Sequence, residues 1–338
     1  MGHLIDLERG ADMAEKRIIA VVGATGRQGG GLVEAILADP QGQFTVRALT
    51  RDASSTGARA LASRGAEVVR ADLDDQRSVV EAFEGAHGAF VMTNFWAQLT
   101  PEQEAARSRV DMELEQAANA ARAAKAAGIR HVVWSSLEDT RPFFERTGDK
   151  VPRPMAGYTV PHMDVKAAAD AFFTDLEVPT TFLRTAWFYE NLFLGMGPSR
   201  TTDGELILTI PLAHHTLAAH AAADIGRSAL SLFKAGSEYI GKTVGIAGDH
   251  LTGEEMAAVL SGTLGEKVTY RPFTWDEFRG FGFPHAVEFA NNLQFMAEND
   301  AEFTAARNVE WTRSINPQLE SLKSWAEKHK ESLRALNA

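Results

Sequence analysis

Two side chains near the middle of the chain are spaced for acid–base chemistry. His162 and Lys166 stand four residues apart, so a helix would carry both on one face. Hydride-transfer sites commonly place a tyrosine four residues before a lysine, where the lysine lowers the pKa of the phenol and the phenol protonates a carbonyl oxygen. Here His162 takes the tyrosine position, and an imidazole titrates near neutral pH and can give up a proton.

The spacing leaves the source of the proton open. Tyr158 lies eight residues before Lys166, too far for the usual partnership on a regular helix. Three alternatives follow: His162 donates the proton, water or the substrate supplies it, or the site has no catalytic role. His162 could equally pack against or cap its helix, whereas Lys166 fits ribose binding better than a solvated surface position.

A glycine-spaced turn near the start of the chain predicts a phosphate site. The residues at 23–29 read Gly-Ala-Thr-Gly-Arg-Gln-Gly, between an apolar run and a helix-period pattern. Gly23 allows a sharp turn, Gly26 lets the backbone approach a pyrophosphate, and Gly29 lets the helix pack close to the strand. The helix N-terminus adds free N–H groups and a partial positive charge. We therefore expect dinucleotide binding; the alternative is a purely structural turn.

The end of the second expected strand, 44–49, distinguishes between two dinucleotides. An NAD site places an acidic residue there for the ribose 2′-hydroxyl. This chain has Arg51 at that point, and Arg27 in the glycine turn could approach from the other side. Two guanidinium groups favour a 2′-phosphate and hence NADP(H). Asp52 comes one residue late and keeps NAD(H) open, and Arg51 could also be a solvated surface charge.

Short apolar runs alternate with helix-period segments from residue 17 to residue 136. The expected strands are 18–22, 44–49, 67–71, 88–93 and 131–135, with 180–184 further on, and the main helices are 57–64, 74–83, 102–127 and 165–173. This alternation predicts an α/β fold, a Rossmann-like doubly wound parallel sheet with helices on both faces. Ligands of such sheets lie at the carboxyl ends of the strands.

Polar and aromatic residues follow several of these strands. Asp72 could accept a hydrogen bond from an adenine amino group or cap a helix, and the segment 93–96 suits the nicotinamide side or a loop packed on the core. The segment 187–193 is strongly aromatic and could line a pocket for a flat ligand or belong to the core. The loop expected at 138–161, which carries Phe143 and Tyr158, has the length of a lid.

The C-terminal part has a different character. We expect a hairpin at 201–212, an edge strand at 268–272, a strand at 243–247, and helices at 218–234, 252–264, 275–281, 284–296 and 317–333. The expected organisation is a flexible N-terminal extension (1–16), a nucleotide-binding domain (17–185) and a smaller α+β substrate-side or cap region with closing helices (186–338).

Composition excludes several classes of function. The 338 residues carry a net charge of -11, which disfavours nucleic-acid and anionic-membrane partners. The chain has no cysteine, so disulfides, thiolate metal sites and cysteine nucleophiles are excluded. No spacing of histidines and carboxylates predicts a metal site. No membrane-length apolar run or signal peptide is visible, so we expect a cytoplasmic protein, which could form a homodimer.

Together these motifs resemble the NmrA-like family of atypical short-chain dehydrogenase/reductases, and within it the NADP(H)-sensing NmrA-like domain proteins. The segments that carry the resemblance are 23–29, 50–51, 93–96, 162–166, 188–191, 281–284 and 325–330. The resemblance covers nearly the whole chain beyond the N-terminal extension. It implies a Rossmann-like domain, a small C-terminal substrate-side region and a cofactor between them.

The resemblance also implies a role for each segment. The pyrophosphate would be held by Gly23, Thr25, Gly26, Arg27, Gln28 and Gly29, and the 2′-phosphate by Arg51. Asp72 and Leu73 would flank the adenine. The nicotinamide half would be surrounded by Thr93, Asn94, Phe95, Lys166, Phe188, Tyr189 and Asn191. From their aromatic character and their positions near the strand ends, we expect Trp96, Phe143, Tyr158 and Trp187 to form the substrate pocket.

Two functions remain open at this point. One is an NADPH-dependent reductase of a planar quinone-like or aromatic ketone substrate, with Lys166 and His162 as catalytic residues. Its expected partner is therefore a small aromatic molecule. The alternative is a non-catalytic NADP(H)-binding redox sensor that acts through protein partners. The family contains both kinds, and a histidine at the tyrosine position resembles the sensors.

Overall fold

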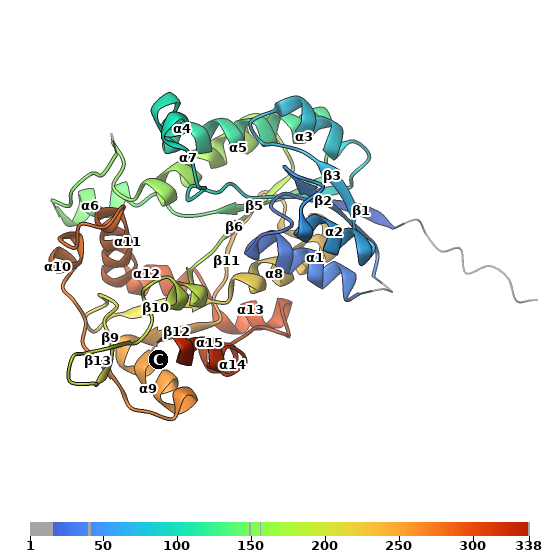
Figure 1. Ribbon diagram of the computed structural model, residues 1–338. Coiled ribbons are helices and arrows are strands. Elements are labelled where there is room, and N and C mark those ends of the chain that lie inside the picture. The colour runs from blue at the N-terminus through green and yellow to red at the C-terminus, as the bar shows by residue number, and fades with distance from the viewer. Residues whose placement is uncertain (1–15, 40–41, 149, 156, 337–338) are drawn as a thin grey trace, which may run out of the picture.

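The core of the molecule is a seven-stranded sheet with the order β11-β6-β5-β4-β1-β2-β3, in which every neighbouring pair is parallel (Figure 1). The computed structural model describes residues 16–39, 42–148, 150–155 and 157–336. The sheet strands are β1 (Arg17–Val21), β2 (Phe44–Thr50), β3 (Glu67–Arg70), β4 (Gly88–Val91), β5 (His131–Ser136), β6 (Thr180–Arg184) and β11 (Thr243–Gly245). The predicted doubly wound parallel sheet is confirmed. Most of the predicted N-terminal extension (1–15) lies outside the described residues.

The helices up to residue 234 are α1 (Arg27–Leu37), α2 (Thr56–Ser63), α3 (Gln76–Phe83), α4 (Pro101–Ala106), α5 (Arg109–Ala126), α6 (Arg141–Thr147), α7 (Pro161–Asp175) and α8 (Ala222–Lys234), and several of them cover the two faces of this sheet. α1 and α8 pack on one face, and α3, α5 and α7 pack on the other, as Figure 1 shows.

The alternation of side chains along the strands explains the two layers. Ile19 and Val21 of β1 pack with the α1 and α8 side, whereas Ala20 between them faces the α3 and α5 side. All four residues of β4 are buried, as expected for a central strand covered on both faces. The sheet therefore has two separate hydrophobic cores.

The chain beyond β6 builds two small sheets and the closing helices. The sheets have the orders β12-β10-β7 and β13-β9-β8. Their strands are β7 (Trp187–Phe188), β8 (Ser199–Arg200), β9 (Leu206–Leu208), β10 (Thr216–His220), β12 (Asp249–Thr252) and β13 (Val268–Tyr270). The helices are α9 (Gly253–Leu264), α10 (Trp275–Arg279), α11 (Ala286–Glu298), α12 (Asp300–Ala305), α13 (Val309–Ile315), α14 (Leu322–Lys328) and α15 (Lys330–Ala335). The predicted hairpin near 201–212 and the predicted edge strand at 268–272 are confirmed as β8–β9 and β13.

Four predictions of helix position were wrong. The single helix expected at 102–127 is two helices, because Arg107 is extended and the Ser108 hydroxyl caps α5 by accepting from the Asp111 amide. The loop expected at 138–161 contains α6. The helix expected from 218 starts at 222, because β10 pairs with β12 and β7 as far as His220. The helix expected at 317–333 is α14 and α15.

Two elements that follow the predicted domain boundary at residue 185 belong to the main sheet and the helices that cover it. β11 pairs with β6 as an edge strand of the main sheet, and α8 packs along α1. In the part of the chain that the structure describes, no helix is both long enough and apolar enough to cross a membrane.

Candidate functional site

The glycine turn between β1 and α1 has the geometry that a phosphate loop needs. Gly23 has a φ of +67°, a conformation that favours glycine. Gly29 lies so close to the strand that an added Cβ would be 2.5 Å from the Gly23 carbonyl oxygen and 2.7 Å from that of Val22. Both neighbours are backbone atoms and cannot give way. Any larger residue at 29 would therefore push α1 away from β1.

The N-terminus of α1 suits an anion. Gly26 is the capping residue and contributes no side chain, and the first turn of this 11-residue helix holds no acidic residue. The exposed Thr25 and Arg27 flank the turn, whereas Gln28 is tied to β5 through its Oε1, which accepts from the Ser135 hydroxyl at 2.8 Å. The open helix end and the crowded Gly29 fit a pyrophosphate, so the residues present fit a dinucleotide.

The carboxyl ends of β2 and β3 carry the predicted adenosine contacts. Arg51 follows β2 and is exposed. The Asp52 carboxylate is engaged locally, because it accepts from the amide and the hydroxyl of Ser54 at 2.8 and 2.6 Å. The hydroxyl bond is the main cause that lowers the pKa of Asp52. The Asp52 carboxylate is therefore engaged with its own loop, and the assignment of the ribose end to Arg51 stays a prediction.

Asp72 and Leu73 follow β3. The Asp72 carboxylate accepts from the Asp74 amide at 3.1 Å, and the Leu73 carbonyl accepts from Asn119 at 2.8 Å. The residue that caps α3 is Asp75, so the alternative of a capping role for Asp72 was wrong.

Lys166 on α7 reaches the end of β4. Its ammonium nitrogen lies 2.7 Å from Oε1 of Glu113 and donates to the carbonyl and hydroxyl oxygens of Thr93 at 3.0 and 2.8 Å. The Thr93 hydroxyl donates to the same Glu113 oxygen at 2.7 Å. Glu113 is fully buried. These acceptors engage all three donors of the ammonium.

Glu113 was not among the predicted site residues, although the sequence holds a signal for it. Glu113 lies on α5 four residues before Ala117 and seven before Ala120, both of which are buried against the sheet. A charged residue within the apolar stripe of a helix needs a buried partner. Reading α5 as the amphipathic helix it is would have placed Glu113 beside the sheet edge.

His162 is held by a second carboxylate that the sequence analysis missed. Oε1 of Glu288, on α11, accepts from the His162 backbone amide at 2.9 Å and lies 2.8 Å from Nδ1 of its ring. Burial raises the pKa of Glu288, but the hydrogen bonds from His162 and the nearby ring of His285 outweigh it and lower this pKa to about 2. Glu288 is therefore an anion at neutral pH. Nothing in the local sequence links it to His162.

An aromatic cluster surrounds His162. The Trp96 ring is stacked on the Phe289 ring, with 4.9 Å between the ring centroids. The centroid of Trp96 lies 5.2 Å from that of His162 and 5.0 Å from that of His285. The ring centroids of Phe95 and Trp96 are 5.1 Å apart. Trp96 and Tyr158 both pack against the small core of Phe95, Val110 and Val165. The structure thus brings Trp96, Tyr158 and His162 into one region near Lys166. Asn94, between Thr93 and Phe95, is exposed.

Several predicted site residues lie in the core instead. Tyr189 is fully buried, and its hydroxyl donates to Asp249 at 3.0 Å; burial raises its pKa. Trp187 and Phe143 are 3% and 6% exposed and belong to the same hydrophobic core. These contacts agree with the core alternative that was given for the aromatic segment 187–193, and they place Phe143, which was expected in a lid-length loop, in the same core. Phe188 and Asn191 are partly exposed.

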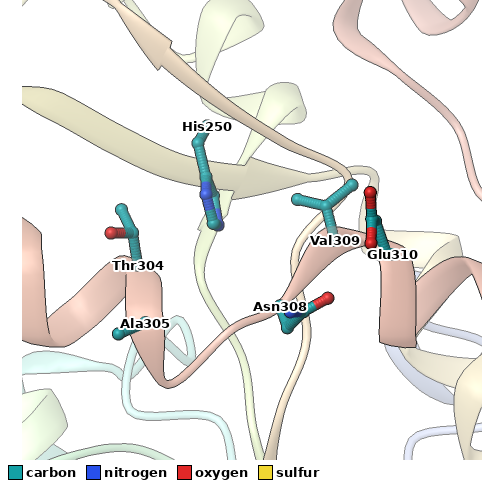
Figure 2. A pocket seen from close by; sticks show the side chains of 6 residues that line it. All are labelled: His250, Thr304, Ala305, Asn308, Val309 and Glu310. Carbon is teal, nitrogen blue, oxygen red and sulfur yellow. The ribbon is translucent and has the colours of Figure 1, made fainter.

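The structure also contains a hollow of about 370 Å³ outside the predicted site (Figure 2). It is lined by His250, Thr304, Ala305, Asn308, Val309 and Glu310. His250 comes from β12, Thr304 and Ala305 come from the end of α12, Asn308 comes from the link that follows, and Val309 and Glu310 come from the start of α13 (Figure 2). None of them is a predicted site residue. The described residues hold no group of three or more His, Cys, Asp or Glu side chains that could bind a metal ion.

The parallel sheet, the glycine turn and the open end of α1 define a Rossmann-like protein of the doubly wound α/β class. The sequence model of the NmrA-like family matches residues 15–327, so the chain belongs to the NmrA-like family. The predicted resemblance is confirmed.

Relatives and solved structures agree with this family. The chain is 28% identical to the NmrA-like family domain-containing oxidoreductase hkm9 of Aspergillus hancockii, over 94% of this chain and 98% of that protein. The structure of NmrA, a negative transcriptional regulator, in complex with NADP has a TM-score of 0.69 at 22% identity and covers 95% and 98% of the two chains. The NADPH-dependent quinone oxidoreductase QOR2 of Escherichia coli, complexed with NADPH, has a TM-score of 0.66 at 22% identity, covering 94% and 99%. At 22% identity, the two comparisons with solved structures show that the fold is shared and nothing further.

Proposed function

We propose that the protein is an NADPH-dependent oxidoreductase that reduces a planar quinone-like or aromatic ketone substrate. The observation that carries the proposal is the position of His162. Its ring is fixed through Nδ1, and no described residue hydrogen-bonds its Nε2. The ring lies beside Trp96, four residues from Lys166. This leaves one ring nitrogen for a substrate oxygen next to a flat aromatic surface.

In this proposal the N-terminus of α1 holds the pyrophosphate and Arg51 pairs with the 2′-phosphate. When bound, the reduced nicotinamide supplies a hydride. Lys166 and Thr93 lie at the end of β4, where they would meet the ribose of the nicotinamide half. The names of relatives support the general class, since hkm9 is named an oxidoreductase and QOR2 a quinone oxidoreductase.

The division of labour follows the predicted organisation. Residues 17–185 would bind the nucleotide and residues 186–338 would supply the substrate side, with α8 and β11 as structural support for the first part. Trp96 and Tyr158 would contact the substrate ring. Quinones accept hydride readily and need only a weak proton donor, so the missing tyrosine matters less for them than for ketones.

Rapid mixing tests this function directly. Protein loaded with NADPH is mixed with a panel of quinones and aromatic ketones, and the absorbance of the reduced nicotinamide is followed. We expect acceptor-dependent loss of this absorbance, faster for quinones than for ketones. The absence of any loss across the panel would overturn the proposal.

The second candidate is a redox sensor that binds NADP(H) without turnover. The observation that favours it is the ammonium of Lys166, whose three donors already have protein acceptors. A sensor needs different affinities for its partners, or different shapes, in the NADPH, NADP and nucleotide-free states. Hydrogen exchange in the three states tests this requirement. Identical exchange in all three would remove this candidate.

A further inference from the structure

The contact between His162 and Glu288 joins two elements far apart in the sequence. One carboxylate oxygen accepts both the backbone amide and the ring of His162, at 2.9 and 2.8 Å. An ionised carboxylate can only accept hydrogen bonds, so Nδ1 must carry the proton in this contact. Glu288 is fully buried, which shields the pair from water. The contact therefore fixes both the orientation and the tautomer of the imidazole.

A second histidine lies on the other side of the same carboxylate. His285 precedes α11 in a left-handed backbone conformation, with a φ of +68°. Its Nδ1 lies 3.7 Å from Oε2 of Glu288, and that oxygen has no hydrogen-bond partner among the described residues. A left-handed conformation is strained for a residue other than glycine and is maintained only where the surroundings enforce it. The His285 ring therefore faces Oε2 of Glu288 and does not occupy the oxygen that holds His162.

We propose that Glu288 is a positioning residue that holds His162 in the Nδ1–H tautomer, so that Nε2 is the atom that delivers a proton to the substrate. This inference rests on the proposed function. The carbonyl carbon of the substrate gains the hydride, and the electron pair of its C=O π bond moves to the oxygen. The oxygen then takes the proton from Nε2 of the His162 imidazolium, whose N–H bonding pair stays on the ring. Solvent reprotonates Nε2, while Nδ1–H stays on Glu288 throughout.

Apart from His285, which faces Oε2 of Glu288, the other ionisable groups near this cluster are engaged elsewhere. They are Lys166 and Asp164 on α7 and Glu113 and Arg109 on α5. Asp164 accepts from the amides of Thr140, Thr159 and Val160. Lys166 and Glu113 pair with each other, and Arg109 donates to the carbonyls of Phe95 and Ala97. Glu288 is the one carboxylate among the described residues that contacts the His162 ring.

The first test measures the ¹⁵N chemical shifts of the His162 ring nitrogens by NMR, in the full-length protein and without any substrate. We expect ¹⁵N shifts of a protonated Nδ1 and an unprotonated Nε2 for neutral His162. Glu288→Leu should lose this pattern and shift toward the Nε2–H form that free imidazole prefers. Glu288→Gln keeps a neutral acceptor oxygen and should retain the pattern in part. Glu298→Leu on the same helix is the matched control and should change nothing. A wild-type His162 in the Nε2–H form would overturn the proposal.

The second test separates positioning from folding. For an aromatic ketone, Glu288→Gln should lower kcat roughly 100-fold with KM nearly unchanged, because proton donation and not binding is impaired. A rise in KM with unchanged kcat would contradict the proposal. If wild-type protein reduces no acceptor, the proposed function fails, while the ring-nitrogen shifts still decide whether Glu288 fixes the tautomer.

Discussion

The ammonium nitrogen of Lys166 lies 2.7 Å from a carboxylate oxygen of Glu113, inside the layer between the sheet and α5. The Lys166 side chain is about one-tenth exposed and that of Glu113 is fully buried. A buried ion pair contributes little net stability over an apolar pair, but breaking it leaves an uncompensated charge in a poorly solvated place. The pair therefore makes the predicted ribose-binding lysine depend on a residue of another helix.

Glu113→Ala should lower the free energy of unfolding by about 3 kcal/mol, because it leaves the Lys166 ammonium unpaired. Urea unfolding at neutral pH measures this loss. The double variant Glu113→Ala/Lys166→Met removes both charges and should recover part of it. A double variant that loses the sum of the two single losses would show that the two groups do not interact.

Much of the fold could be predicted because local patterns carry it. One stretch of sequence holds the apolar run of β1, the glycine turn and the start of α1. The glycine turn is recognised by the strand before it and the helix after it, so the three can be predicted together. The strand β4 reads as a continuous apolar run because it is buried on both faces of the sheet. The predicted strand ends therefore lie on one edge, and with them Arg51, Asp72 and Thr93.

The candidate site could be predicted only where it is local. Glu288 lies 126 residues after His162, and its role depends on how α11 packs against α7. Tyr189 follows a strand end, as ligand-binding residues do, but the packing of α14 encloses it: its ring lies 5.7 Å from that of Trp325. The break between α4 and α5 depends on a single serine cap at Ser108. Tertiary contacts, and not local preference, decided these positions.

Gly226→Ala should destabilise the protein by at least about 3 kcal/mol. A Cβ on Gly226 would lie 1.9 Å from the Leu32 nitrogen and 2.3 Å from the Gly31 carbonyl carbon, so α8 would have to move away from α1. Thermal or urea unfolding measures the loss. Gly262→Ala is the control: Gly262 is exposed in α9 and its Cβ would meet nothing within 4 Å. That variant should be more stable by about 0.5–1 kcal/mol. Equal effects of the two substitutions would contradict the close packing of α1 and α8.

The buried ring of His220 should make stability depend on pH. Its Nε2 accepts the Ala186 amide at 3.0 Å, and its Nδ1 lies 2.8 Å from the Ala221 carbonyl oxygen. Both contacts need a neutral ring, and burial lowers the pKa of His220 to about 4. The unfolded chain takes up the proton near pH 6.5. The free energy of unfolding should therefore fall by roughly 3 kcal/mol as the pH falls from about 6.5 to about 4.

Comparison with His220→Gln isolates this contribution. Glutamine can make both backbone contacts but does not titrate. The free energy of unfolding of the variant, measured in urea between pH 7 and pH 4, should therefore depend less steeply on pH than that of the wild type. The difference in slope should correspond to about one proton. The comparison is needed because other groups titrate in the same range. Burial lowers the pKa of His131 to about 4, which adds to the loss in acid, and raises that of Asp170 to about 6, which opposes it. Parallel pH curves for wild type and variant would show that burial does not shift the pKa of His220 from its unfolded value.

Arg51→Ala should weaken NADPH binding far more than NADH binding. A charge-assisted contact between a guanidinium and a phosphate is worth about 1.5–3 kcal/mol, so the NADPH affinity should fall roughly 10- to 100-fold. NADH has no 2′-phosphate, and its affinity should change little; calorimetry with both nucleotides measures the difference. Arg64→Ala is the matched control, because Arg64 is an exposed arginine paired with Glu34 at the end of α2, away from the glycine turn. Equal losses for both nucleotides would assign the 2′-phosphate to another group, and Arg27 in the glycine turn would be the first to substitute next.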